Sequence, residues 1–148
     1  MIGNGGHASV CREIGESDYF IAVGDNAARK REAEAITGSW VADTLIHPTA
    51  WVSPTASIGP GTVIMAGAVI QAHARIGSHV IVNSLASCDH HSVVEDFAHI
   101  APGAHLCGNV HVGEGALIGV GVGIEPGVKI PAWSVVKREK YVISLPSN

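Results

Sequence analysis

The fold is decided by residues 58–82, which read IGPGTVIMAGAVIQAHARIGSHVIV. An apolar residue stands at every sixth position of this stretch, and the period continues without a break on both sides. Sixteen positions follow it, fifteen of them Ile, Val or Leu: Ile46, Val52, Ile58, Ile64, Ile70, Ile76, Val82, Cys88, Val94, Ile100, Leu106, Val112, Ile118, Ile124, Ile130 and Val136. Such a period fits neither a straight α-helix nor the alternation of one long strand. It predicts short strands separated by regular corners.

A second set of residues, all small or β-branched, follows four positions after these apolar residues. Its members are Ala50, Ala56, Thr62, Ala68, Ala74, Val80, Ala86, Ser92, Ala98, Ala104, Val110, Ala116, Val122, Val128 and Ser134. Each side therefore turns one large and one small residue inward, which predicts a parallel β-solenoid. If three sides close one coil of 18 residues, residues 46–136 hold five coils. Strands stack about 4.8 Å apart, so the prism is about 24 Å long.

Residues 1–45 differ from the repeat and predict a small α/β unit. Residues 2–7 (IGNGGH) read as a strand end that enters a glycine turn, and residues 8–14 as a short helix. Residues 19–23 (YFIAV) read as an apolar strand, and residues 27–36 as a polar helix.

The composition indicates a surface that is partly covered by other subunits. Charged residues make up 15% of the chain, against roughly 25% in an average soluble domain. The net charge of −4 provides no basic surface for nucleic acid or an anionic membrane. No run reaches the roughly 18 apolar residues that span a bilayer, and the chain does not open on a basic and apolar leader, so we expect a cytoplasmic protein. The three cysteines, Cys11, Cys88 and Cys107, lack CxxC spacing, and we expect reduced thiols.

Residues 83–110 carry the motif that points to chemistry, NSLASCDHHSVVEDFAHIAPGAHLCGNV. This segment closely resembles the hexapeptide-repeat sugar acetyltransferases, a family that includes UDP-4-amino-sugar N-acetyltransferases and sialic acid O-acetyltransferases. The resemblance extends to residues 3–7 (GNGGH) and 21–26 (IAVGDN). It implies left-handed coiling, although parallel crossovers are right-handed as a rule.

The expected fold is therefore mainly β, a left-handed parallel β-helix of five coils preceded by a small, abridged Rossmann-like α/β domain. By the resemblance, residues 1–45 bind a nucleotide sugar, and residues 46–136 bind acetyl-CoA and carry catalysis. Residues 137–148 form a tail with no readable fold.

The resemblance implies that His90 is the catalytic base, a role that suits an imidazole. His90 stands two residues after an inward position, so its ring can face outward at a corner. Stacking by 18 residues places Gly108 one coil above it, where a glycine lets a thioester approach and its N–H can stabilise an oxyanion. Spacing alone favours a solvated corner histidine at His90, and a simple turn glycine is the alternative at Gly108.

His91 stands where the family usually has a carboxylate that orients the base. An imidazole does not replace that charge, and Asp89 is the nearest substitute, so both residues stay open as the orienting group. His99 matches a family histidine that contacts acetyl-CoA. The resemblance also implies cofactor contacts for Gly108, Gly119 and Val120.

The glycine turn resembles the nucleotide-sugar loop of the family. It implies substrate contacts for Gly5, Gly6, His7, Gly24, Ile36 and Asn83. The second strand and the acidic pair that the family has in this domain are absent from the sequence, so either the pocket is abridged or residues of this domain are missing from the sequence as given.

Metal binding is the main competing hypothesis, because seven of the nine histidines lie between His73 and His111. Stacking places His73 beneath His91, and His111 one coil and two residues beyond it. Related carbonic anhydrases of this fold use a His-x4-His pair, which the chain lacks, so we expect no metal.

We therefore predict an acetyl-CoA-dependent N-acetyltransferase that acts directly on the amino group of a UDP-4-amino sugar. The family works as a homotrimer with acetyl-CoA between neighbouring prisms. Cys88 occupies an inward position, which argues against an acyl-cysteine intermediate. The alternatives are an O-acetyltransferase acting on sialic acid or another sugar, a zinc hydratase of the same fold, and an inactive scaffold trimer.

Overall fold

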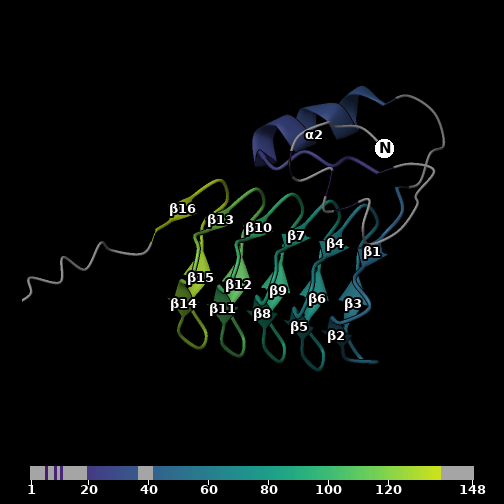
Figure 1. Ribbon diagram of the computed structural model, residues 1–148. Helices are drawn as coiled ribbons and strands as arrows, with labels where there is room; N and C mark the ends of the chain where they lie inside the picture. Colours follow the sequence, from purple (N-terminus) through teal and green to yellow (C-terminus); the bar gives the residue numbers. More distant parts are fainter. Residues whose placement is uncertain (1–5, 7–8, 10, 12–19, 37–41, 138–148) are drawn as a thin grey trace, which may run out of the picture.

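The computed structural model describes residues 6, 9, 11, 20–36 and 42–137. Its main feature is a three-sided prism of two-residue parallel strands (Figure 1). The strands are β1 (Leu45–Ile46), β2 (Trp51–Val52), β3 (Ser57–Ile58), β4 (Val63–Ile64), β5 (Val69–Ile70), β6 (Arg75–Ile76), β7 (Ile81–Val82), β8 (Ser87–Cys88), β9 (Val93–Val94), β10 (His99–Ile100), β11 (His105–Leu106), β12 (His111–Val112), β13 (Leu117–Ile118), β14 (Gly123–Ile124), β15 (Lys129–Ile130) and β16 (Val135–Val136).

Every third strand belongs to the same sheet, which confirms the predicted coil. One sheet has the order β1-β4-β7-β10-β13-β16, the second β14-β11-β8-β5-β2, and the third β15-β12-β9-β6-β3. Paired residues are always 18 positions apart, as in the pairs Ile64 with Val82 and Cys88 with Leu106. The prism therefore has about five coils, as the six-residue period predicts.

The interior of the prism is built from the two predicted inward sets. The large residues of the central coils, such as Ile70 and Ile100, are fully buried, and so are the small ones, such as Ala86 and Ala104. A large and a small side chain alternate around each coil, so the narrow interior is filled without aromatic residues. This close packing explains how a chain with 5% aromatic residues forms a dense core.

The corners place non-glycine residues in the left-handed region of backbone space, which few such residues adopt. Residues in successive coils share this conformation at each corner, for example His73 (φ 60°), His91 (φ 60°) and Asn109 (φ 59°). Each is fixed by a hydrogen bond to the coil before, as when His91 N–H donates to the carbonyl of Ala72 (3.0 Å). The outward side chains of a corner therefore form a column along the prism.

Helix α2 (Asn26–Ala35) lies across the sheet that contains β7 and β10 (Figure 1). Asp25 caps its N-terminus by accepting a hydrogen bond from Ala28 N–H (2.7 Å). Arg29, 1% exposed, fastens the helix to the prism by donating to the carbonyls of His79 (2.8 Å) and Phe97 (2.7 Å). Burial lowers the pKa of Arg29 to about 10, and the charge of Asp25 opposes this shift.

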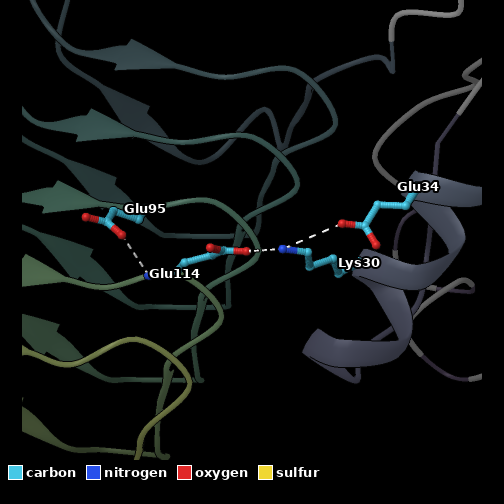
Figure 2. A network of polar contacts seen from close by, with 4 residues as sticks. All are labelled: Lys30, Glu34, Glu95 and Glu114. Carbon is cyan, nitrogen blue, oxygen red and sulfur yellow. Dashed lines mark hydrogen bonds and ion pairs between the residues drawn. The ribbon is translucent and has the colours of Figure 1, made fainter.

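A surface network also links α2 to the corner between β12 and β13 (Figure 2). Lys30 Nζ lies 2.5 Å from Glu114 Oε1 and 3.6 Å from Glu34. Glu114 N–H in turn donates to Glu95 (2.9 Å). The hydrogen bond that Lys30 donates to Glu114 raises the pKa of Lys30. Because these groups face solvent, the network adds little to the stability that Arg29 provides.

The described residues of the N-terminal unit show no Rossmann-like domain. The polar helix forms, with bounds one residue earlier than expected, and Ser9 and Cys11 of the predicted helix at residues 8–14 are helical. The predicted strand at residues 19–23 is wrong in its described part, residues 20–23, where a bridge at Ile21 takes the place of a strand.

The described part of this apolar segment packs on the prism. Phe20 and Ala22 are buried in a cluster with Leu45, Val63, Met65, Ile81 and Cys11. The predictions for residues 2–5, for His7 and for residues 138–148 lie outside the described residues. No helix in the described ranges is long and apolar enough to cross a membrane.

Candidate functional site

His90 lies in the corner loop between β8 and β9, with its side chain exposed. Its Nδ1 lies 3.2 Å from Nδ1 of His91, and its backbone N–H donates to Oδ1 of Asp89 (2.8 Å). One of the two imidazoles must carry the hydrogen that joins the Nδ1 atoms. When His90 carries it, Nε2 of His90 presents the lone pair that a general base requires.

Gly108 contacts the ring of His90 from the next coil, as the 18-residue stacking predicts. A methyl group at Gly108 would lie 2.5 Å from Cε1 and 2.6 Å from Nε2 of His90, closer than real Cβ contacts allow. Gly108 is buried, and its carbonyl accepts a hydrogen bond from Gly127 N–H (3.0 Å). A glycine is therefore needed here by close approach, because any side chain would displace the imidazole.

The two candidates for orienting His90 contact different parts of it. His91 meets the ring, with the two ring centroids 5.4 Å apart and edge to face. Among the described residues, the carboxylate of Asp89 accepts a hydrogen bond only from the backbone N–H of His90 and does not contact its ring. His91 also packs on His73 one coil below, at a centroid distance of 5.0 Å. The column of His73 and His91 that the sequence predicts is therefore present.

His99 lies on a different face of the prism, at the start of β10 and beneath the N-terminus of α2. Its Nε2 lies 3.1 Å from Nδ2 of Asn83, so these two candidates are in contact. A cavity of about 220 Å³ is lined by His99 together with Gly24, Asn26 and Trp133. The structure thus brings the predicted substrate residue Gly24 to the predicted cofactor residue His99.

The remaining candidates neither contact His90 nor line the cavity beside His99. Gly119 and exposed Val120 follow β13, at the same corner as Asn83 but two coils further on. Ile36 caps the C-terminus of α2, whereas Gly24 precedes its N-terminus, so the length of the helix separates them by about 15 Å. Ile36 does not line the cavity that contains Gly24. Gly6 is helical and exposed.

Comparison with known proteins identifies the family. No protein-family model and no curated protein matches the chain. Among solved structures, PerB from Caulobacter crescentus in complex with CoA and GDP-perosamine is 33% identical, with a TM-score of 0.81 over 93% of this chain and 87% of that one. The chain belongs to the left-handed β-helix sugar acetyltransferases.

A second relative in this family is the acetyltransferase domain of PglB from Neisseria gonorrhoeae FA1090, solved with acetyl coenzyme A. It is 40% identical, with a TM-score of 0.76 over 78% of this chain. The chain spans only 57% of the length of that structure. Another structure of the same PglB domain is 41% identical, and the chain spans 61% of it. The family membership agrees with the left-handed coiling that the motif implies.

Within this acetyltransferase fold, the candidate residues fall into two groups that one protomer does not bring together. His90 lies at the corner joining the sheets of β8 and β9. In a three-sided prism, that corner is the edge opposite the third sheet, which contains β10 and is covered by α2. His99 and Gly24 are therefore on the far side of the prism from His90.

The surroundings of Cys88 and His111 bear on the acyl-cysteine and metal hypotheses. Cys88 is fully buried, and burial raises its pKa to about 12, so its thiol is a poor nucleophile at neutral pH and is out of reach of a substrate. His111 lies apart from the column of His73 and His91. Its Nε2 pairs with Glu95 (2.6 Å), and this hydrogen bond lowers the pKa of the Glu95 carboxyl. No set of three potential metal ligands gathers within residues 20–36 and 42–137.

Sequence reasoning missed Arg29, Asn26 and Trp133. Arg29 and Asn26 belong to a polar helix without apolar periodicity, and Asn26 donates to the carbonyl of Gly115 (3.1 Å). Trp133 falls between the inward positions of the last coil. No spacing signal distinguishes these residues from surface positions, so only the docking of α2 reveals them.

Proposed function

We propose that this chain is an acetyl-CoA-dependent N-acetyltransferase whose acceptor is the amino group of a nucleotide-activated sugar. One observation carries the proposal: the exposed ring of His90 rests on Gly108 in a chain that aligns over 93% of its length with a structure containing CoA and GDP-perosamine. The sequence motif favours a UDP-4-amino sugar as the acceptor.

In the proposed reaction, His90 acts as general base with Nε2. It accepts a proton from the acceptor nitrogen as the N–C bond to the acetyl carbon forms. Gly108 leaves room for the thioester, and its N–H stabilises the negative oxygen of the tetrahedral intermediate. His90 then returns the proton to sulfur as the C–S bond breaks. The products are the N-acetylated sugar and CoA with a free thiol.

His91 supplies the orientation of the base in this proposal. Its Nδ1 lies within hydrogen-bond distance of Nδ1 of His90, and its own ring is held by His73. An imidazole partner holds the ring without adding a negative charge.

We further propose a homotrimer, because a second copy is needed to complete the site. His90 and the cavity of Gly24 and His99 lie on opposite sides of one prism, as described above. The corner beside His99 also carries two strongly exposed apolar side chains, Leu85 (67% exposed) and Val120 (66% exposed). Packing this corner against the His90 edge of a neighbour covers them and joins the two halves of the site.

The test is an acceptor screen with acetyl-CoA, in which the release of free CoA thiol is measured. The acceptors are a UDP-4-amino sugar, GDP-perosamine and sialic acid, and the wild type is compared with His90→Asn. We expect an N-acetylated product from the UDP-4-amino sugar and none from the variant. Turnover of sialic acid alone would replace N- by O-acetylation, and turnover of GDP-perosamine alone would correct the nucleotide. Mass measurement in solution should give three times the 15.3 kDa chain mass.

A further inference from the structure

A separate hollow opens beside His90 on the same edge of the prism. It has a volume of about 500 Å³ and is lined by His73, Arg75, His91 and Asn109. His73, His91 and Asn109 stand at equivalent corner positions in three successive coils, and all three have φ near +60°. Arg75 belongs to β6, next to this corner, and is exposed. The four side chains therefore converge from two adjacent parts of one edge.

All four lining side chains can donate hydrogen bonds, and none of them is acidic. The Arg75 guanidinium is permanently charged, and among residues 20–36 and 42–137 no carboxylate forms an ion pair with it. The nearest acid along the chain, Asp89, has its Oδ1 engaged by the backbone N–H of His90. On the sheet of Arg75, Glu95 is engaged by His111. The hollow thus combines a fixed positive charge with polar donors, which suits an anion.

The hollow also adjoins His90, because His91 both lines the hollow and contacts the His90 ring. His91 is shared between the two, because its Nδ1 lies 3.2 Å from His90 Nδ1 while its ring packs on His73 at 5.0 Å. A group bound in the hollow therefore contacts the residue that orients the base, at a distance from the Nε2 that receives the proton. In a 4-amino sugar nucleotide, the diphosphate and the amino group stand at opposite ends of one sugar ring. An acceptor of this shape can present its anion to the hollow and its amine to His90.

We propose that His73, Arg75, His91 and Asn109 form a binding site for the anionic group of the acceptor. The shared chemistry is an oxyanion held by the guanidinium and the neighbouring donors. It comes either from the diphosphate of a nucleotide sugar or from the carboxylate of an acidic sugar. This inference rests on the proposed function, since it names the part of the acceptor that the edge beside His90 recognises.

The experiment compares Arg75→Gln with Lys129→Gln. Lys129 is a matched control, because it is an exposed cation at the equivalent strand position of the same sheet, three coils further on. Three acceptors are used: a UDP-4-amino sugar, the same amino sugar as an uncharged methyl glycoside, and sialic acid. The measured quantity is the ratio of kcat/KM for each charged acceptor to that for the uncharged one.

We expect Arg75→Gln to lower this ratio about tenfold, the size of one lost charge-assisted hydrogen bond, and Lys129→Gln to leave it unchanged. A drop confined to the UDP sugar assigns the site to the diphosphate, and a drop confined to sialic acid assigns it to the carboxylate. Rescue by Arg75→Lys supports recognition of charge. An unchanged ratio in Arg75→Gln, or an equal drop in Lys129→Gln, overturns the proposal.

Binding of inorganic pyrophosphate and of acetate, followed by calorimetry, separates this inference from the proposed function. If the wild type acetylates no acceptor but binds pyrophosphate or acetate more tightly than Arg75→Gln does, the site stands and the proposed function fails. If acetylation proceeds while wild type and Arg75→Gln bind both anions equally, the site fails and the proposed function stands. The difference should shrink at high salt, because exposed charges are screened.

Discussion

The corner that carries His91 and the corner that carries His79 have the same backbone and different surroundings. Both histidines adopt left-handed φ values, 60° and 54°, and each ring contacts a ring one coil away. His91 is exposed, whereas His79 lies under α2, where its carbonyl accepts from Arg29. The side chain of His79 stacks flat on Phe97, with the planes 2° apart.

This difference shows that the repeat produces corners with equivalent backbones. Whether α2 covers a corner then determines what its side chains contact. The covered corner binds the helix and has an aromatic, partly buried column. The open corner has polar rings, a close glycine and a hollow beside it. Variants on the two corners should therefore affect different properties: turnover and ligand binding at the open corner, and the free energy of unfolding at the covered one.

The largest effect is expected at the open corner. His90→Ala should lower kcat by about 10²–10⁴, the usual contribution of a general base, because no other group replaces Nε2. Thermal unfolding and oligomeric mass should match the wild type, since the exposed ring adds little packing. Activity is measured by thiol release with saturating acetyl-CoA. A kcat close to that of the wild type would remove His90 from the mechanism.

At the covered corner, Arg29→Met should lower the free energy of unfolding by about 3 kcal/mol. The substitution leaves the carbonyls of His79 and Phe97 without the donor that now satisfies them beneath α2. Urea denaturation gives the value. Arg31→Met is the control, because Arg31 is on the same helix but exposed, and it should change stability by less than about 0.5 kcal/mol. Equal losses in both variants would mean that Arg29 does not anchor the helix.

A smaller effect is expected from filling the space beside the base. Gly108→Val should weaken acetyl-CoA binding by about tenfold or more, and should weaken sugar binding less, because the new side chain displaces the ring of His90 into the path of the thioester. Calorimetry with each ligand measures this. Gly123→Ala is the matched control, since a Cβ there meets nothing within 4 Å. A uniform loss for both ligands would place the thioester elsewhere.

The smallest effect is a pH dependence at the covered corner. Burial and, next, the charge of Arg29 hold the pKa of His79 below its ordinary value of 6.5, while Asp96 opposes them. The unfolded chain therefore binds this proton more readily, and the native state loses stability as the pH falls from about 6.5 to the lowered pKa. His79→Phe keeps a flat ring and removes the titration. Its unfolding free energy should fall less than that of the wild type over this range, measured by urea denaturation at several pH values.

The prism could be predicted almost completely from the sequence, because every sixth side chain faces inward and the coil length follows from three equal sides. Gly108 and His90 could be matched by the same arithmetic. The N-terminal unit could not, since the apolar run at residues 19–23 has the same pattern whether it pairs in a sheet or packs against one. The docking of Arg29 depends on carbonyls of residues 79 and 97, which only the folded prism brings beneath the helix. The separation of His90 from His99 likewise depends on which sheets meet at each corner.

The constant spacing of 18 residues between stacked neighbours has a consequence for how such a protein can change in length. Removal of one whole coil shortens the prism and leaves every surviving side chain facing as before. Removal of a single residue inside a coil turns all later inward residues toward solvent, up to the next compensating change. Insertions and deletions in the chain should therefore be tolerated in multiples of a coil, or as loops that leave the prism at a corner. A catalytic position can be moved along such a scaffold only in steps of one strand spacing, about 4.8 Å.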